Sequence, residues 1–302
     1  MSVFLIVLTY NPGPVWLRWI AAVKCQREFV RILVVDSSST DGTNFSDLPL
    51  NFTVKYIKSE NFTHGGTRNW ALQHVPVDTD VVIFMTQDAV LASPESLQML
   101  LSAFEDPLVA CAYGRQMPHE NATPLAAHAR KFNYPASSRT VSILDQPQLG
   151  IKTCFLSNSF AAYRLSDLVA VGGFPSDVIL GEDMSVAAHV LMAGKRIAYV
   201  ANTCVYHSHN YSITQEFQRY FDTGVFHARS PSLLRAFGGA RGEGIRFVCS
   251  ELSYLWQCAP KLIPSAAVRT LVKWLGYKLG RYESKLPLVI KRICSMHKGY
   301  WS

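Results

Sequence analysis

One acidic residue follows a continuous apolar run in the first half of the chain. The run Val81–Met85 is continuously apolar and is followed by Thr86, Gln87 and Asp88. Strands of this kind belong to sheets that are covered on both faces, and such sheets bind ligands beyond the carboxyl ends of their strands. Asp88 is therefore predicted to lie at a ligand-binding edge, placed for chemistry rather than for solubility.

A second group of polar residues follows the first two predicted strands. Thr9, Tyr10 and Asn11 end the first strand, and the segment Asp36–Thr43 ends the second. An acid at a strand end, followed by small hydroxyl residues, can accept hydrogen bonds from a base or a ribose while the ligand approaches the backbone. Asp-Ser-rich segments also serve as helix caps and turns, so this segment alone leaves both interpretations open.

The segment His64–Asn69 combines two glycines with an arginine at the start of a predicted helix. Gly65 and Gly66 allow a ligand to come close to the backbone, and Arg68 can pair with phosphate oxygens in a forked geometry. The alternative is a glycine-rich helix start with an exposed arginine. Because the segment lies between a strand and the strand that leads to Asp88, we favour phosphate binding.

Two adjacent acids, Glu182 and Asp183, begin another predicted helix. Acids in the first turn of a helix are electrostatically favourable whether or not they do chemistry, so capping alone also explains them. A catalytic role requires one of them to point into a cleft.

Other common site motifs are missing from the sequence. No Gly-x-Gly-x-x-Gly follows the first strand and no Gly-Lys-Ser/Thr is present, which disfavours dinucleotide enzymes and P-loop hydrolases. The seven cysteines are scattered without a Cys-x-x-Cys pair, which argues against a zinc or redox site and favours reduced thiols in a cytosol.

The elements that must position these residues alternate between strand and helix. The predicted strands are Val3–Thr9, Val30–Val35, Val54–Ile57, Val81–Met85, Phe160–Arg164 and Ile197–Val200, and the predicted helices are Val15–Lys24, Thr67–His74, Pro94–Phe104 and a helix from Glu182 that Gly194 ends. The segment from about Arg115 to Gly150 has neither period and is interpreted as a loop or excursion. The alternation predicts an α/β fold with a parallel sheet.

The C-terminal part of the chain is strongly basic. From Lys261 to Ser302 there are nine Lys or Arg and one acid, a charge of +8, whereas the rest of the chain sums to −1. On a helical wheel of residues 268–286, one face gathers Val268, Leu271, Val272, Leu275, Leu279, Tyr282 and Leu286. A basic amphipathic helix is typical of a membrane-surface element, and the alternative is a helix packed on the catalytic domain with its charges in water. No recognition motif accompanies the charge, so nucleic acid is not an expected partner.

The sequence predicts neither a membrane-spanning helix nor a signal peptide. No window approaches the roughly 18 apolar residues of a spanning helix. The N-terminal apolar run lacks a preceding basic residue and is cut off at Asn11, so we interpret it as a strand and not as a signal peptide.

Six motifs in this order resemble the inverting glycosyltransferases of family 2, which have the GT-A fold. They are Thr9-Tyr10-Asn11, Asp36–Gly42, Gly65–Asn69, Gln87-Asp88-Ala89, Gly172-Gly173-Phe174 and Glu182-Asp183, and the resemblance covers about Val3 to Asn210. The variants His-Gly-Gly-Thr-Arg-Asn and Thr-Gln-Asp-Ala are further similar to bacterial rhamnosyltransferases of O-antigen and related cell-wall polysaccharide assembly.

The resemblance implies a Rossmann-like nucleotide-diphospho-sugar transferase with a mixed, mainly parallel sheet flanked by helices. Residues 1–212 would form the GT-A catalytic domain, with a nucleotide-binding half at 1–115 and an acceptor and base half at 150–212. Residues 213–302 would form a helical, basic C-terminal extension that associates with a membrane.

The resemblance also implies a role for each motif residue. The nucleotide sugar would be bound by Thr9, Tyr10, Asn11, Asp36, Ser38, Asp41, Gly65, Gly66, Arg68, Gln87 and Asp88, with Arg68 and the two glycines near the diphosphate. Asp88 matches the last acid of the family's Asp-x-Asp motif, which meets a divalent metal, Mg²⁺ or Mn²⁺, that bridges the diphosphate. Asp183 would be the general base that takes a proton from the acceptor hydroxyl in a single displacement with inversion.

The sequence departs from the family pattern at the first acid of Asp-x-Asp, where it has Thr86 or Gln87. Fewer acidic ligands weaken a metal site, so a nitrogen ligand is expected to help. Enzymes of this fold often supply a late histidine, and we expect His207 rather than His209 to fill that position. The alternatives are that His207 serves packing and that Asp88 binds sugar hydroxyls directly.

The segment that follows Asn210 resembles the family less. Gln215 and Arg219 are one residue too far apart for the Gln-x-x-Arg-Trp motif of processive synthases, so a non-processive transferase is expected. Tyr220 and Asp222, with Glu182, are candidates for the acceptor site, although a helix facing the core explains Tyr220 and Asp222 equally well.

The expected function is that of a cytoplasmic glycosyltransferase, peripheral on the inner membrane. It would move L-rhamnose from dTDP-L-rhamnose to a lipid-linked saccharide anchored in the inner leaflet. The alternatives are a UDP- or GDP-linked donor, a sugar-nucleotide nucleotidyltransferase, whose glycine-rich signature near the first strand is missing, and an inactive carbohydrate-binding relative.

Overall fold

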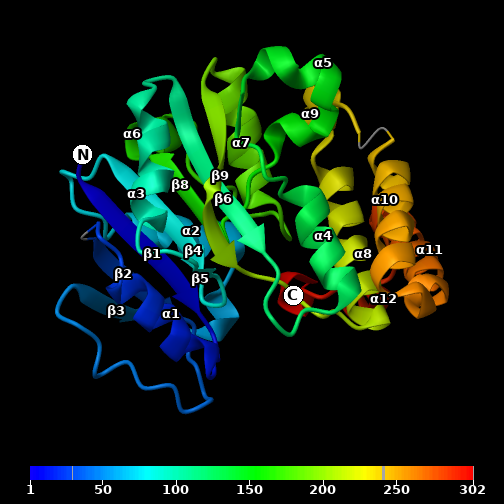
Figure 1. Cartoon of the computed structure of the whole chain (residues 1–302), viewed down its shortest axis with the longest axis horizontal. Helices are drawn as coiled ribbons and strands as arrows, with labels where there is room; N and C mark the ends of the chain where they lie inside the picture. The colour runs from blue at the N-terminus through cyan, green and yellow to red at the C-terminus, as the bar shows by residue number, and fades with distance from the viewer. Residues whose placement is uncertain (29, 240–241, 302) are drawn as a thin grey trace.

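A nine-stranded sheet forms the centre of the computed structural model, which describes residues 1–28, 30–239 and 242–301 (Figure 1). Its order is β3-β2-β1-β4-β8-β6-β9-β5, and β7 also pairs with β9. The strands are β1 (Val3–Thr9), β2 (Arg31–Asp36), β3 (Phe52–Tyr56), β4 (Val81–Thr86), β5 (Val90–Leu91), β6 (Val109–Met117), β7 (Arg139–Val141), β8 (Phe160–Arg164) and β9 (Arg196–Tyr206).

Most of these strands run in one direction. β1 to β4 are parallel neighbours, and β8 is antiparallel to both β4 and β6, so β6 and its parallel partner β9 return to the first direction. Among the described strands that pair directly with β9, the short β5 and β7 are antiparallel to it. The expected mixed, mainly parallel sheet is confirmed.

Helices cover both faces of the sheet (Figure 1). They are α1 (Val15–Lys24), α2 (His64–Leu72), α3 (Ser96–Leu101), α4 (Pro124–Asn133), α5 (Gln146–Leu149), α6 (Leu165–Ala170), α7 (Glu182–Met192), α8 (Ile213–Arg229), α9 (Pro231–Phe237), α10 (Glu243–Cys258), α11 (Ile263–Arg281) and α12 (Leu288–Cys294). Leu5 and Val7 of β1 pack with α1 and α3 on one face, whereas Phe4 and Ile6 pack with α2, α7 and α8 on the other. Burial on both faces explains why the strand sequences are continuously apolar.

The interpretation of residues 115–150 as a loop is wrong in part. This segment contains the end of β6, the helix α4, the strand β7 and the short α5. β6 was not predicted because its second half is polar, with Arg115 and Gln116, although it lies between β8 and β9 in the sheet. The start of α4 did have a signal, since Thr123 accepts a hydrogen bond from the Ala126 amide and Pro124 follows it.

The C-terminal extension is helical, as expected, and its longest helix packs closely on α8. A Cβ atom added to Gly280 would lie 2.0 Å from the Phe221 carbonyl oxygen, and one added to Gly276 would lie 2.5 Å from that of Phe217. α11 therefore meets α8 through small residues, which lets the two backbones approach. The helix ends at Arg281, five residues before the predicted end at Leu286.

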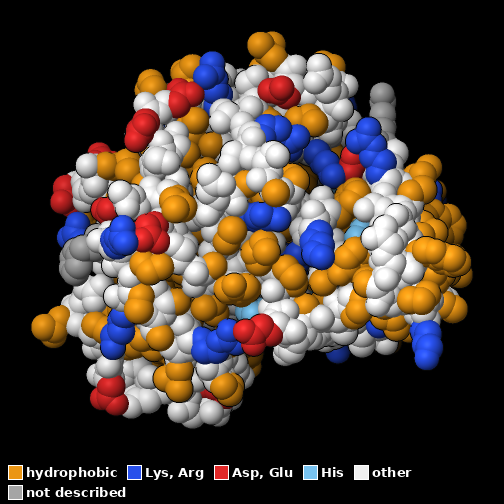
Figure 2. Space-filling model, viewed as in Figure 1, with side chains coloured by type: hydrophobic (Ala, Val, Ile, Leu, Met, Phe, Trp, Pro, Cys, Tyr) orange, Lys and Arg blue, Asp and Glu red, His pale blue; other side chains and the backbone are white. Residues whose placement is uncertain are grey.

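This packing leaves much of the predicted apolar face of α11 in contact with solvent. Val268, Leu271, Leu275 and Tyr282 are exposed, whereas Leu279 packs against the core. Figure 2 shows hydrophobic side chains along the edge where Figure 1 places α10 and α11. No helix in the described part of the chain combines the length and apolar character that crossing a bilayer requires.

Candidate active site

Three potential metal ligands meet at the carboxyl ends of β4 and β9. The Asp88 Oδ2 atom lies 3.4 Å from His207 Nε2 and 3.8 Å from His209 Nδ1, and the ligand atoms all lie within 4.8 Å of one another. The strand β5, two residues after Asp88, pairs with the end of β9 and so holds the two segments together. One carboxylate oxygen and two imidazole nitrogens form a donor set that suits a divalent cation such as Mn²⁺.

The orientation of His207 is set by Gln116 of β6. His207 Nδ1 lies 2.9 Å from Gln116 Oε1, which also accepts a hydrogen bond from the guanidinium of Arg130. Because Arg130 only donates, this atom of Gln116 is the oxygen, and His207 Nδ1 must carry the proton. Nε2 of a neutral His207 then presents a lone pair to the Asp88 carboxylate, so a proton or a cation has to lie between them.

The protonation states of this cluster also suit a cation. Burial works against the charged form of Asp88, but His207, when its Nε2 carries a proton and donates to Asp88, and the neighbouring His209 hold the pKa of that carboxyl well below its usual range. Burial, together with the neighbouring His207, lowers the pKa of His209 to about 4. At neutral pH the cluster therefore offers a charged carboxylate and an unprotonated His209. Sequence reasoning ranked His209 below His207, whereas the structure brings both to Asp88.

Gln87 does not face this cluster. Its side-chain oxygen accepts a hydrogen bond of 2.7 Å from the Tyr10 amide, and its side-chain nitrogen donates to the Tyr10 carbonyl at 3.0 Å. This two-point contact ties the end of β4 to the end of β1. The residue that replaces the usual acid therefore positions the segment that carries Tyr10.

The expected nucleoside residues gather at the ends of β1 and β2. Asp36 is buried and accepts hydrogen bonds from the Thr9 hydroxyl at 3.0 Å and from the Ser39 amide at 2.9 Å. Asn11 and Ser38 both have positive φ angles, of 45° and 62°, which turn the backbone sharply at this edge. Two further contacts join the segments, since the Asn11 amide donates to Ser39 and the Gly13 amide donates to Asp41. Tyr10 stays 52% exposed and so remains available to a ligand.

Arg68 and Glu182 pair with each other in the interior. The Arg68 Nη1 atom lies 2.8 Å from Glu182 Oε1, and the two side chains are only 4% and 6% exposed. Arg68 also donates to the His64 carbonyl. The structure therefore engages Arg68 with an acid, instead of presenting it to a diphosphate, and it removes Glu182 from the acceptor side. Both ions are buried, and each needs the other because an unpaired buried charge is costly.

The two glycines before Arg68 are explained by packing within the chain. A Cβ atom at Gly65 would lie 1.8 Å from the carbonyl oxygen of Pro175, and one at Gly66 would lie 2.5 Å from the hydroxyl of Thr63. The close approach that sequence reasoning assigned to a ligand is made by the segment that follows Gly172-Gly173-Phe174.

Asp183 lies next to this buried ion pair, in the first turn of α7. Its carboxylate accepts hydrogen bonds from the Asn158 amide at 3.2 Å and from the Met184 amide at 2.8 Å. Burial raises the pKa of Asp183 to about 7, and the negative charge of Glu182 contributes in the same direction. A carboxyl with a pKa near neutrality is suited to accept a proton during a reaction.

The other two acceptor candidates lie on α8 and do not behave alike. Asp222 is completely buried and accepts hydrogen bonds from the amides of Met296, at 2.9 Å, and His297, at 3.2 Å. It anchors the C-terminal segment, so its expected place in the acceptor site is corrected to a structural role. Tyr220 is 37% exposed, with Lys273 of α11 5.9 Å from its ring centre.

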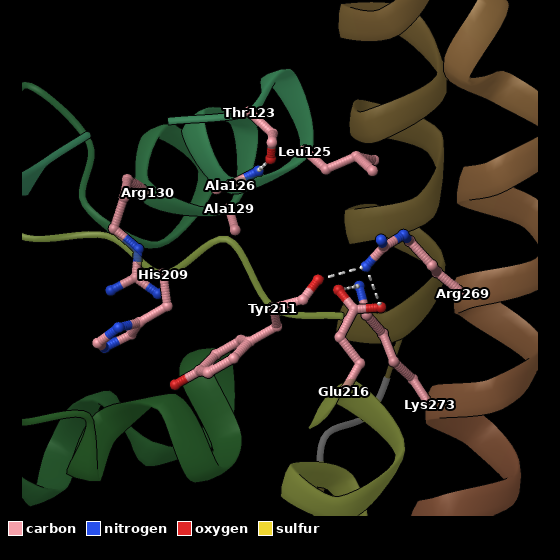
Figure 3. A pocket seen from close by; sticks show the side chains of 10 residues that line it. All are labelled: Thr123, Leu125, Ala126, Ala129, Arg130, His209, Tyr211, Glu216, Arg269 and Lys273. Carbon is pink, nitrogen blue, oxygen red and sulfur yellow. Dashed lines mark hydrogen bonds and ion pairs between the residues drawn. The ribbon is translucent and has the colours of Figure 1, made fainter. Parts of the chain in front are cut away.

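A small cavity beside His209 connects the cluster to the C-terminal helices (Figure 3). Arg269 of α11 donates to the Tyr211 carbonyl at 2.9 Å and pairs with Glu216 of α8, which Lys273 also approaches. The Tyr211 ring in turn stacks on His209 at 5.0 Å. The supporting residues Gln116, Arg130, Asn158 and Tyr211 were not found from the sequence, because no motif marks a residue that acts through another side chain.

Comparisons with known proteins show the family to which the chain belongs. Residues 4–172 match the family model described as "Glycosyl transferase family 2". The chain is 50% identical, over its whole length and 96% of the relative, to the O-antigen chain rhamnosyltransferase RfbN of Salmonella typhimurium. It is 50% identical, over the same shares, to the O-antigen chain rhamnosyltransferase WbaN of Salmonella anatum.

Among solved structures, the mannosyltransferase PcManGT from Pyrobaculum calidifontis, in complex with GDP-Man and Mn²⁺, has the same fold. It superposes with a TM-score of 0.58 at 18% identity, covering 93% of this chain and 84% of that one. The chain therefore belongs to glycosyltransferase family 2, and it is a glycosyltransferase with a C-terminal helical extension.

Proposed function

We propose that this protein transfers L-rhamnose from dTDP-L-rhamnose to a hydroxyl of a lipid-linked saccharide during assembly of a cell-surface polysaccharide of the O-antigen type. The observation that carries the proposal is the 50% identity to two O-antigen chain rhamnosyltransferases over the whole chain. The match spans the whole chain, so it covers the segments that carry the candidate active site as well as the rest of the fold.

We propose that Asp88, His207 and His209 hold Mn²⁺ or Mg²⁺. When bound, the cation would neutralise the charge that develops on the leaving nucleoside diphosphate. The support is the donor set itself and the hydrogen bond from His207 to Gln116, which leaves Nε2 directed at Asp88. Metal ligands of this kind commonly donate their other ring N–H to a neighbouring acceptor.

Asp183 is proposed as the general base. The acceptor hydroxyl would donate its proton to the Asp183 carboxylate as its oxygen attacks the anomeric carbon, and the nucleoside diphosphate would leave on the opposite side, which inverts the configuration. The raised pKa of Asp183 supports this role, because a base with a pKa near the working pH takes protons efficiently without being mostly protonated beforehand.

The donor nucleoside is proposed to bind at the ends of β1 and β2. Tyr10 and Asp41 are exposed there, while buried Asp36 holds the two segments in place through Thr9 and Ser39. An exposed aromatic ring beside hydrogen-bonding groups suits a nucleobase, which has a flat face and polar edges.

We further propose that α10 and α11 rest on the inner-leaflet surface, near the lipid-linked acceptor. Trp256 and Trp274 are 74% and 54% exposed, and Lys278 lies 5.9 Å from the Trp274 ring centre. Exposed tryptophans with neighbouring lysines suit the boundary between lipid headgroups and acyl chains. Part of the positive charge of α11 is neutralised within the protein, however, because Arg269 and Lys273 pair with Glu216.

The decisive experiment offers the purified protein a panel of dTDP-, UDP- and GDP-linked sugars with Mn²⁺ or Mg²⁺ and a lipid-linked saccharide acceptor. We expect transfer from dTDP-L-rhamnose alone, with an inverted linkage in the product. Transfer from a UDP- or GDP-linked sugar in its place would overturn the donor assignment, and a retained configuration would overturn the single displacement.

The membrane proposal is tested by sedimentation with vesicles that contain anionic phospholipid. The double variant Trp256→Ser, Trp274→Ser should lose most of its vesicle binding, whereas Leu17→Ser should not, since Leu17 is 72% exposed but lies on α1. Equal binding by both variants would contradict the assignment of this surface.

A further inference from the structure

Several basic side chains around the candidate active site are engaged by other residues of the chain. Arg68 pairs with Glu182, and Arg130 donates to Gln116. Arg269 and Lys273 both meet Glu216 at the cavity of Figure 3. The side chain of Arg219 has no hydrogen bond or ion pair within residues 1–28, 30–239 and 242–301, although it lies on α8 beside the same site.

Arg219 is placed next to the metal-ligand cluster by two aromatic contacts. Its guanidinium carbon lies 5.8 Å from the ring centre of Tyr211, and that ring stacks on the imidazole of His209 with ring centres 5.0 Å apart and planes 28° apart. The guanidinium is therefore one aromatic ring away from a proposed metal ligand.

The charge of Arg219 also acts on two histidines that contact each other. The ring centres of His64, at the start of α2, and His297 are 5.0 Å apart. Burial lowers the pKa of both imidazoles, and the positive charge of Arg219 acts in the same direction, so that the pKa of His297 is about 3. The charge of Arg219 therefore acts on the start of α2 as well as on His209 of the metal-ligand cluster.

Asp222, on the same helix, does not neutralise the charge of Arg219. Asp222 is one helical turn away, but its Oδ2 atom accepts the amides of Met296 and His297, and the carboxylate is completely buried whereas Arg219 is exposed. Arg219 is therefore free to meet an anion that enters the site.

We propose that Arg219 binds the diphosphate of the donor beside the metal, in the role that the sequence suggested for Arg68. This inference rests on the proposed function, because it requires a nucleotide-sugar donor. A planar guanidinium can hold two phosphate oxygens at once, and it would stabilise the charge on the leaving nucleoside diphosphate together with the cation held by Asp88.

The test measures dTDP binding by calorimetry in the presence of Mn²⁺, for the full chain and two variants at position 219. Arg219→Ala should weaken dTDP binding about 10- to 100-fold, the effect of losing charge-assisted hydrogen bonds to an ion. Arg219→Lys should recover part of this loss because it keeps the charge but not the fork. Arg235→Ala is the matched control, since Arg235 is also exposed but lies on α9, and it should bind dTDP as the unaltered protein does.

Two results would overturn the inference while leaving the proposed function intact. The first is unchanged dTDP affinity in Arg219→Ala combined with a raised KM for the acceptor, which would assign Arg219 to the acceptor. The second is an equal loss of Mn²⁺ affinity measured without nucleotide, which would mean that Arg219 only positions His209 through Tyr211. If the unaltered protein itself failed to bind dTDP while binding another nucleoside diphosphate, the donor assignment would fail, and the same variants would then be tested with that nucleotide.

Discussion

Asp88 and Asp183 lie on two sides of the candidate active site, one after the end of β4 and the other in the first turn of α7. Asp88 faces two imidazoles, at 3.4 and 3.8 Å, and its pKa is held below the usual range. Asp183 is partly buried beside the carboxylate of Glu182, and its pKa is raised to about 7. The same side chain is thus kept charged in one region and is able to take up a proton in the other.

This difference separates two chemical roles. A carboxylate that stays charged among nitrogen ligands is suited to hold a cation, and one that titrates near neutrality is suited to exchange a proton. Substitutions at Asp88 and at Asp183 should therefore alter different measured quantities.

The largest expected effect comes from Asp183→Asn. The amide cannot accept the acceptor's proton, so kcat should fall by about 10²- to 10⁴-fold while dTDP affinity stays unchanged. Steady-state kinetics and calorimetry measure the two quantities. Asp177→Asn is the control, because Asp177 is an exposed acid on the segment that leads to α7. Full activity in Asp183→Asn would remove the base assignment.

Asp88→Asn should affect the opposite region. The loss of the one carboxylate in the cluster should reduce kcat/KM by about 100- to 1000-fold, the several kcal/mol that a cation contributes at a developing charge. Titration with Mn²⁺ should show weaker binding, and chelation should inactivate the unaltered protein. Activity that survives thorough chelation would mean that Asp88 has another role, such as binding sugar hydroxyls directly.

A smaller effect is expected at Gln116, which touches no substrate. Gln116→Leu removes the acceptor that orients His207, so Mn²⁺ affinity should fall about 10- to 100-fold with little change in the pH profile. The same change at Gln98, which is exposed on α3, serves as the control. An unaltered Mn²⁺ affinity in Gln116→Leu would mean that His207 is oriented without it.

The smallest expected effect is a shift in the pH profile of kcat/KM in the variant Glu182→Gln. Because the base must be unprotonated, kcat/KM should rise with pH through an apparent pKa near 7. Glu182→Gln removes a neighbouring negative charge and leaves the positive charge of Arg68 unpaired. The pKa of Asp183 should therefore fall, and the rising limb of the kcat/KM profile should move to lower pH. A limb that moves to higher pH, in a variant whose melting temperature shows it to be folded, would contradict the role given to Glu182.

The elements that carry these residues were predictable where burial on both faces leaves a continuous apolar run. β1, α1 and β8 have the predicted bounds, and β4 differs by one residue. β6 and α4 were not predicted, because their polar residues serve partners elsewhere in the chain. Gln116 and Arg130, which orient His207, come from these two elements.

Residue type and order determined the family of this protein and its α/β fold, and they marked Asp88 and Asp183 as candidate site residues, since such features depend on strand ends and local chain chemistry. The tertiary structure decided the partners. It paired Arg68 with Glu182, brought His209 as well as His207 to Asp88, and used Asp222 to anchor the C-terminal segment. It also left the Arg219 side chain without an ion pair among the described residues. These outcomes depend on which charged side chains come together from elements that are far apart in the sequence. A local sequence pattern does not predict such contacts.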